Sequence, residues 1–240
     1  MSADVHVFHD NNLSTGINPR MAIQLRQQYG LKQLVETGTC YGPTAEFGAL
    51  LFGEVFTCEL CPDLFPGTGD RLDKYPTVHR FYGDSVQWLL DLDMKHQPPS
   101  LVWLDAHWTA VGPRPEGGDT PILQELEAIG GCHGKHVILI DDIRIFGNPQ
   151  WPTIADLETA ADHMNGYFQY IGDVMVITPD PFAFSESTRL IEFSSGAFPD
   201  GSFQSVASAF YRPGSPTSTA AATRFPILPP RFRSSMASYC

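Results

Sequence analysis

The sequence predicts an α/β protein with a doubly wound, mostly parallel seven-stranded sheet that ends in an antiparallel hairpin. Short apolar runs alternate with segments of helical periodicity between residues 19 and 179, a pattern typical of parallel strands joined by helices. Only residue 173 separates the last two apolar runs. Because parallel strands need a long crossover connection, these two strands are expected to pair as a hairpin.

Five strands are predicted before the hairpin, at residues 33–37, 55–60, 78–82, 101–105 and 136–142. Residues 136–142 form the most continuous apolar run in the chain, which indicates a central strand covered by helices on both faces. The hairpin strands are residues 167–172 and 174–178. A short further strand is expected at residues 190–193.

Apolar residues at helical spacing, together with end signals, predict the helices. Gly30 is a C-terminal stop for the first helix, and Pro43 suits the first position of the second. The predicted helices are residues 21–29, 43–51, 85–92, 122–129 and 154–164.

The 240 residues suggest one domain with a tail. We expect the domain to span residues 1–200. Residues 201–240 contain four arginines, no other charged side chain, and a Ser- and Pro-rich composition, which predicts a flexible C-terminal tail.

The net charge of −12 argues against a nucleic-acid partner, because phosphate contacts require clustered Lys and Arg. No apolar run reaches the roughly 20 residues of a membrane helix, and no basic segment leads into an apolar stretch near the start. We therefore expect a cytoplasmic protein with a small-molecule substrate, as a monomer or a homo-oligomer. The five scattered cysteines are expected to be free thiols.

Acidic residues stand where each of the five predicted parallel strands ends. They are Glu36, Glu59, Asp84, Asp105 and the pair Asp141–Asp142. In an open parallel sheet, ligands bind at the carboxyl ends of the strands, near the point where the strand order reverses. Acids at all five ends therefore predict a shared cleft.

The turn after the first strand indicates the type of ligand. Gly38 and Gly42 allow a ligand to approach the backbone, but the turn lacks both the dinucleotide glycine pattern and the lysine of a P-loop. A carboxylate at Glu36 would repel a pyrophosphate and attract an ammonium or sulfonium group. Glu59 suits two ribose hydroxyls, and Asp84 suits the exocyclic amine of an adenine.

Over about residues 20–180 these motifs resemble the class I S-adenosylmethionine (SAM)-dependent methyltransferases. That family has an acid-x-Gly motif after the first strand, an acid ending the second, a Gly-Asp pair after the third, and a closing hairpin. The resemblance implies a Rossmann-like methyltransferase fold and SAM as cofactor. The cofactor-binding residues that it implies are Glu36, Gly38, Thr39, Gly42, Glu59, Asp84, Ser85 and Asp105. One departure is Cys40, which replaces the middle glycine of the fuller GxGxG form.

The remaining acids indicate a metal site. Asp105, Asp141 and Asp142 at adjacent strand ends would repel one another without a cation, and hard oxygen ligands suit Mg²⁺. This arrangement resembles the metal-dependent small-molecule O-methyltransferases of the macrocin type, which implies that these three residues hold Mg²⁺ or another divalent cation. His107 and Asp105 are the predicted catalytic residues. His107 is the candidate general base, because imidazole titrates near neutral pH, and a metal ligand in the alternative.

The predicted function is methyl transfer from SAM to a small-molecule acceptor, a hydroxyl, assisted by a divalent metal. Trp103, Trp108 and residues 108–119 are expected to shape the acceptor pocket. Arg114 either binds an anionic group of the acceptor or is a solvated loop residue. Arg144 is expected to brace the acidic pair.

Three other functions remain compatible with these residues. An NAD-dependent oxidoreductase would use Glu59 for its ribose, although the dinucleotide glycine pattern is missing. A metal-dependent hydrolase would use Asp105, His107, Asp141 and Asp142 without SAM. A non-catalytic SAM-binding protein would keep the fold alone. Binding of SAM and methyl transfer to an acceptor distinguish these possibilities.

Overall fold

A computed structural model of the chain describes residues 5–6, 16–108, 118–130, 134–185 and 193–194. The predicted loop residue Arg114 and the predicted tail lie outside these residues, as does the domain boundary at residue 200. Within the described residues, no helix is both long and apolar enough to cross a membrane.

The main sheet has seven strands in the order β4-β3-β2-β5-β6-β8-β7. These are β2 (Gln33–Thr37), β3 (Glu54–Glu59), β4 (Val78–Tyr82), β5 (Ser100–Leu104), β6 (Val137–Ile140), β7 (Tyr167–Ile171) and β8 (Val174–Thr178). Strands β2 to β6 pair in parallel, whereas β8 is antiparallel to both β6 and β7. The predicted fold class, with its closing hairpin, is confirmed.

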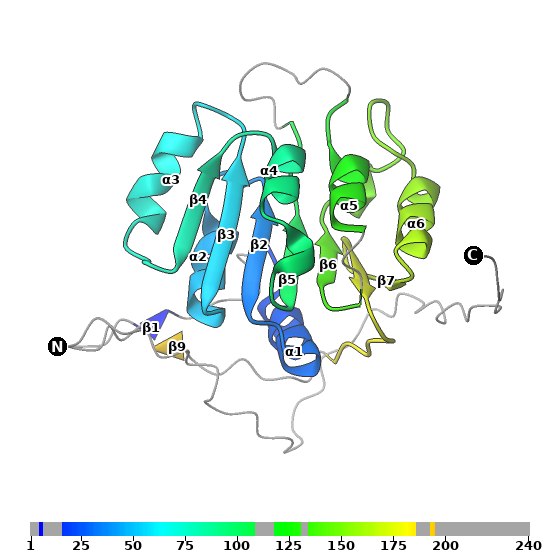
Figure 1. The fold of residues 1–240 in the computed structure, drawn as a ribbon, viewed down its shortest axis with the longest axis horizontal. Helices are drawn as coiled ribbons and strands as arrows, with labels where there is room; N and C mark the ends of the chain where they lie inside the picture. Colours follow the sequence, from blue (N-terminus) through cyan, green and yellow to red (C-terminus); the bar gives the residue numbers. More distant parts are fainter. Residues whose placement is uncertain (1–4, 7–15, 109–117, 131–133, 186–192, 195–240) are drawn as a thin grey trace, which may run out of the picture.

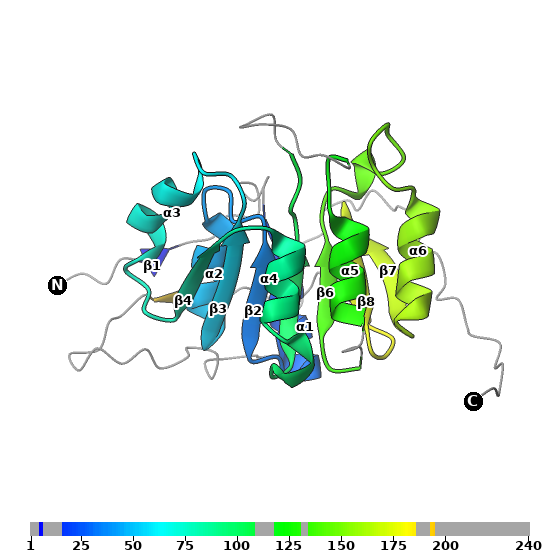
Figure 2. The ribbon, with the colours of Figure 1, turned by 45° about the horizontal axis from the view of Figure 1, so that its top comes forward.

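Helices cover both faces of this sheet (Figure 1). They are α1 (Pro19–Tyr29), α2 (Pro43–Leu51), α3 (Phe65–Leu72), α4 (Ser85–Asp91), α5 (Ile122–Gly130) and α6 (Ile154–His163), with short 3₁₀ turns η1 (Met94–His96) and η2 (Ile143–Ile145). Helices α4, α5 and α6 lie side by side on one face, as Figure 2 shows from a second direction. Helices α1, α2 and α3 contribute to the hydrophobic cluster on the other face.

Helix α3 is an addition to the predicted elements. Its sequence contains Pro66, Gly67 and Gly69, which weaken the helical signal. Thr68 and Leu72, four residues apart, are nevertheless buried on its inner face. Tertiary packing, rather than intrinsic propensity, therefore stabilises this helix.

A separate two-stranded ladder joins β1 (Val5–His6) to β9 (Phe193–Ser194) in antiparallel pairing. Residue 193 of the strand predicted at residues 190–193 lies in β9, and residues 190–192 lie outside the described part of the chain.

The core consists of two apolar clusters, one on each face of the sheet. Alternation along β5 directs Val102 toward the cluster that includes α4, α5 and α6, and Trp103 toward the cluster that includes α1 and α2. Trp103 is fully buried there. Its predicted place in an acceptor pocket is therefore wrong, because the period of the strand turns its ring into the core.

Leu139 of β6 is fully buried at the centre of the sheet. We expect Leu139→Ala to lower the free energy of unfolding by about 2–5 kcal/mol, because truncation removes apolar contacts and leaves a cavity. Urea denaturation followed by circular dichroism measures the change. The matched control is Leu90→Ala on α4, where the leucine is 55% exposed and the expected change is within about 0.5 kcal/mol. Equal losses for the two variants would contradict this account of the core.

Candidate functional site

The sheet order places a topological switch point between β2 and β5. The chain runs outward from β2 to β3 and β4, and then returns to continue from β5 on the other side of β2. Connections on either side of this point diverge, which leaves a crevice at the carboxyl ends of the two strands. The predicted site residues follow these strands and their neighbours.

The turn after β2 packs closely against the backbone that follows β5. Gly38 has a φ of 81°, and a Cβ there would lie 2.6 Å from the carbonyl oxygen of Asp105. The backbone N–H groups of Gly38 and Thr39 both donate to the carbonyl of Cys58, at 2.9 and 3.1 Å. Gly42 has a φ of 78° and is the N-cap residue of α2. The glycines are therefore required by close approach and by left-handed backbone.

Cys40, which replaces a glycine of the fuller motif, has a φ of 48°. Cys40 thus keeps the left-handed backbone conformation that glycine adopts most easily. Its N–H donates to Oε2 of Glu59 at 2.8 Å, while the N–H of Cys61 donates to Oε1 at 2.8 Å. Glu59 therefore ties the turn after β2 to the end of β3.

Glu36, one of the predicted cofactor residues, is only 1% exposed. It accepts a hydrogen bond from Oγ1 of Thr57 at 2.5 Å. Burial raises the pKa of Glu36 to about 8, and the charges of Asp105 and Glu59 act in the same direction against the hydrogen bond from Thr57. The carboxyl is therefore mostly protonated at neutral pH, and an approaching cation would favour its ionised form.

Asp84 and Ser85 stand at the start of α4. Asp84 is exposed and caps the helix, since its Oδ1 accepts from the N–H of Gln87 at 2.9 Å. Ser85, the first helical residue, is buried. The N–H of Gly83 donates to the carbonyl of Glu59 at 3.0 Å, which joins this turn to the end of β3. The nucleoside-side residues predicted from sequence thus share one edge of the sheet.

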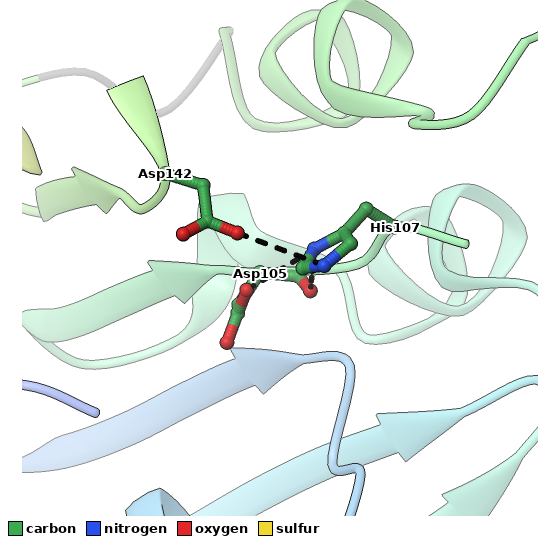
Figure 3. Close-up of side chains that lie close together, drawn as sticks. All are labelled: Asp105, His107 and Asp142. Atoms are coloured by element: carbon green, nitrogen blue, oxygen red, sulfur yellow. Dashed lines mark hydrogen bonds and ion pairs between the residues drawn. The ribbon is translucent and has the colours of Figure 1, made fainter. Parts of the chain in front are cut away.

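On the other side of the switch point, Asp105, His107 and Asp142 converge (Figure 3). Nδ1 of His107 lies 3.3 Å from Oδ1 of Asp105, and its Nε2 lies 3.6 Å from Oδ2 of Asp142. One potential ligand atom from each residue lies within 4.8 Å of the other two. Burial opposes a charge on His107, but the hydrogen bond and charge of Asp105 and the charge of Asp142 raise its pKa overall.

Asp141 belongs to a different group. Its ligand atom clusters with those of Asp142 and Asp173, the latter from the β7–β8 turn. Burial and the charge of Asp105 raise the pKa of Asp141 to about 7. Among the described residues, the three predicted metal ligands Asp105, Asp141 and Asp142 therefore do not form one ligand set. His107 completes the set that Asp105 and Asp142 share.

Arg144 braces Asp142, as the sequence predicted. Its Nη1 contacts Oδ1 of Asp142 and also binds the carboxylate of Asp173. Two carboxylates and an imidazole form a donor set that fits a divalent cation. The Arg144 guanidinium supplies positive charge to Asp142.

A small pocket opens beside this cluster. Its lining residues are Leu104, Asp105, Ala106, His107, Thr120, Ile122, Ile140, Asp141, Asp142, Phe146 and Trp151. The ring of Trp151 lies 5.6 Å from that of His107 and 5.1 Å from that of Phe146. Sequence reasoning missed these two aromatic residues. The available signal was a tryptophan within the Gly-, Asn- and Pro-containing segment 147–152 that follows the acidic pair.

The predicted loop residue Trp108 lies at the edge of the described structure. Its backbone N–H donates to the carbonyl of Asp119 at 2.7 Å, so the two ends of the loop meet. Residues 109–117 between them lie outside the described residues.

The strand order and the closing hairpin now decide the fold. The chain has the predicted Rossmann-like fold, a seven-stranded sheet that closes with an antiparallel hairpin. No family model matches the chain, and no curated protein matches it.

Similar solved structures include an O-methyltransferase from Bacillus cereus in complex with S-adenosylhomocysteine (SAH), at 14% identity and a TM-score of 0.49, over 70% of this chain and 84% of that chain. TomG, an O-methyltransferase from Streptomyces achromogenes, is 17% identical over 66% of this chain and 77% of its own, with a TM-score of 0.46. CalS10, an amino pentose methyltransferase from Micromonospora echinaspora, is 13% identical over 67% and 88%, with a TM-score of 0.45.

The contacts of His107 predict a measurable titration. In metal-free protein we expect Asp142→Asn to lower the pKa of His107, because one of the two charges that favour the imidazolium is removed. The raised pKa of His107 stabilises the fold at pH values below the ordinary range of histidine, and this stabilisation is lost as the pH rises through the folded pKa. Asp142→Asn should therefore lose less folding stability than the wild type over this pH range.

Nuclear magnetic resonance of the histidine ring protons measures this shift. His136 is an internal control, since burial lowers its pKa to about 4 and it precedes β6 at the opposite edge of the sheet. An unchanged His107 titration would show that Asp142 does not act on the ring.

Proposed function

We propose that the chain is a methyltransferase that transfers the methyl group of SAM to a hydroxyl of a small molecule, with a divalent metal at Asp105, His107 and Asp142. The observation that carries the proposal is the pairing of Glu36 and Glu59 around one left-handed turn at the switch point. Among the described residues, no ion pair joins either carboxyl to a basic side chain. Such a site favours a cationic ligand and disfavours a phosphate.

Each side of the crevice has a distinct task in this proposal. Glu59 accepts hydrogen bonds from the ribose hydroxyls while its oxygens keep their backbone donors, since each carboxylate oxygen has two lone pairs. Asp84 accepts from the adenine amine, and Glu36 faces the cationic end of the cofactor. The pocket between His107 and Trp151 holds the acceptor.

The chemistry is an in-line displacement. The acceptor oxygen forms a bond to the methyl carbon as the carbon–sulfur bond breaks, the sulfur keeps the electron pair, and the hydroxyl proton is released to water. The protein contributes chiefly by holding the two reactants in line and excluding other nucleophiles. A divalent metal, when bound, makes the acceptor hydroxyl more acidic.

The cofactor assignment is tested by calorimetric titration with SAM and SAH. Wild-type protein is expected to bind both, and Glu59→Ala should weaken binding by roughly 1–3 kcal/mol through loss of a charged acceptor. The matched control is Glu54→Ala, at the exposed opposite end of β3, which should bind as the wild type does. If the wild type ignores both nucleosides, the proposed function is wrong. If the wild type binds both nucleosides and Glu59→Ala binds them equally well, the ribose assignment alone is wrong.

Metal binding is tested by titrating Mn²⁺ into chelator-treated protein. Asp142 belongs to two possible ligand sets, one with Asp105 and His107 and one with Asp141 and Asp173. Single substitutions of the other members distinguish the two sets. We expect Asp105→Asn and His107→Ala to weaken Mn²⁺ binding at least about tenfold, and Asp173→Asn to leave it nearly unchanged.

If Asp173→Asn weakens Mn²⁺ binding while Asp105→Asn and His107→Ala leave it unchanged, the metal site consists of Asp141, Asp142 and Asp173 instead. Intact Mn²⁺ binding in His107→Ala, together with lost methyl transfer, would return His107 to its predicted role as general base. Full methyl transfer in the presence of chelator would exclude metal assistance.

A further inference from the structure

Glu125 on α5 is a carboxyl where an apolar side chain would be expected. Its neighbours on the helix, Ile122, Leu126 and Ile129, pack into the core, and Glu125 itself is 0% exposed. Among the described residues, neither of its carboxyl oxygens has a hydrogen-bond partner within 3.5 Å. Buried carboxyls without partners are costly, and native proteins contain few of them.

The groups that face Glu125 come from two other elements. They are the hydroxyl of Thr37, the last residue of β2, and the hydroxyl of Ser85, the first residue of α4. Oγ1 of Thr37 is also buried without a partner. The charges of Asp84 and Asp105 act on Glu125 from the cleft side. Polar groups from three elements thus meet beneath the crevice, inside an otherwise apolar layer.

Each hydroxyl adjoins a residue of the cofactor pocket. Thr37 precedes Gly38, the glycine that touches the backbone of Asp105, and Ser85 follows Asp84 at the start of α4. Successive residues of a strand face opposite layers, so Glu36 and Thr37 are directed to opposite faces of β2. Glu125 therefore reaches the turn after β2 from the face that Glu36 does not occupy.

We propose that Glu125 is a positioning residue of the nucleoside pocket, which fixes the turn after β2 and the first turn of α4 through Thr37 and Ser85. This inference rests on the proposed function, because it assigns a role to the pocket that binds SAM. Small shifts of the carboxyl or the hydroxyls complete the hydrogen bonds when the ligand orders both turns. The position of Gly38 relative to Asp84 then depends on one buried side chain.

The protonation state of Glu125 suits this role. Burial raises its pKa to about 7; the hydroxyls of Ser85 and Thr37 oppose this shift, and the charges of Asp84 and Asp105 act in the same direction as burial. A protonated carboxyl can donate one hydrogen bond and accept another. Glutamine has the same capacity and nearly the same shape, whereas methionine keeps the length of the side chain without it.

A positioning role and a merely structural role predict opposite outcomes for stability. Replacing a buried charged or polar group by an apolar one of similar size is often neutral or stabilising. Glu125→Met should therefore melt at or above the wild-type temperature while binding SAH about tenfold more weakly, the scale of one lost hydrogen bond. Glu125→Gln should restore binding to within about threefold of wild type.

The experiment combines thermal denaturation with calorimetric titration of SAH on the full chain. Glu127→Met and Glu127→Gln are matched controls, because Glu127 is two residues away on the exposed side of α5, and both should behave as wild type. Steady-state assays add a third readout in which Glu125→Met raises the KM for SAM and leaves the KM for the acceptor unchanged.

Three results would overturn the inference. They are unchanged SAH affinity in Glu125→Met, loss of folding or of melting temperature in that variant, and failure of Glu125→Gln to restore binding. The two binding results presuppose that wild-type protein binds SAH. Absence of binding by the wild type would instead refute the proposed function, so the two failures are distinguishable.

Discussion

The site depends on one backbone contact, the approach of Gly38 to the carbonyl of Asp105. The contact leaves no room for a Cβ, and it holds together the ends of the two strands on either side of the switch point. The left-handed conformations of Gly38, Cys40 and Gly42 continue this geometry through the turn. Position, rather than any unusual side chain, therefore makes this edge of the sheet a place for ligands.

The fold was largely predictable because its signals are local. Continuous apolar runs such as residues 136–142 give the parallel strands, and a single intervening residue gives the hairpin. Helix α3 was missed because Gly67 and Gly69 hide a helix that tertiary contacts stabilise. Trp103 was misplaced because a strand residue near a cleft can face the core instead.

The site was predictable only in outline. Strand ends that share an edge could be inferred from the alternation of elements, which brought the acids together. The ligand sets could not be inferred, because Asp142 belongs to two groups, one with Asp105 and His107 and one with Asp141 and Asp173, and adjacent positions in the sequence do not reveal this division. Trp151 and Glu125 belong to the site region through contacts between elements, and no spacing in the sequence encodes these contacts.

The closing hairpin has a consequence beyond completing the sheet. Asp173 in its turn accepts the backbone N–H of Arg144 with its side chain and that of Ile143 with its carbonyl, and the Arg144 guanidinium spans from Asp173 to Asp142. Arg144 thus connects the turn of the hairpin to Asp142. Substitutions that move the β7–β8 turn would change how the Arg144 guanidinium is shared between Asp173 and Asp142.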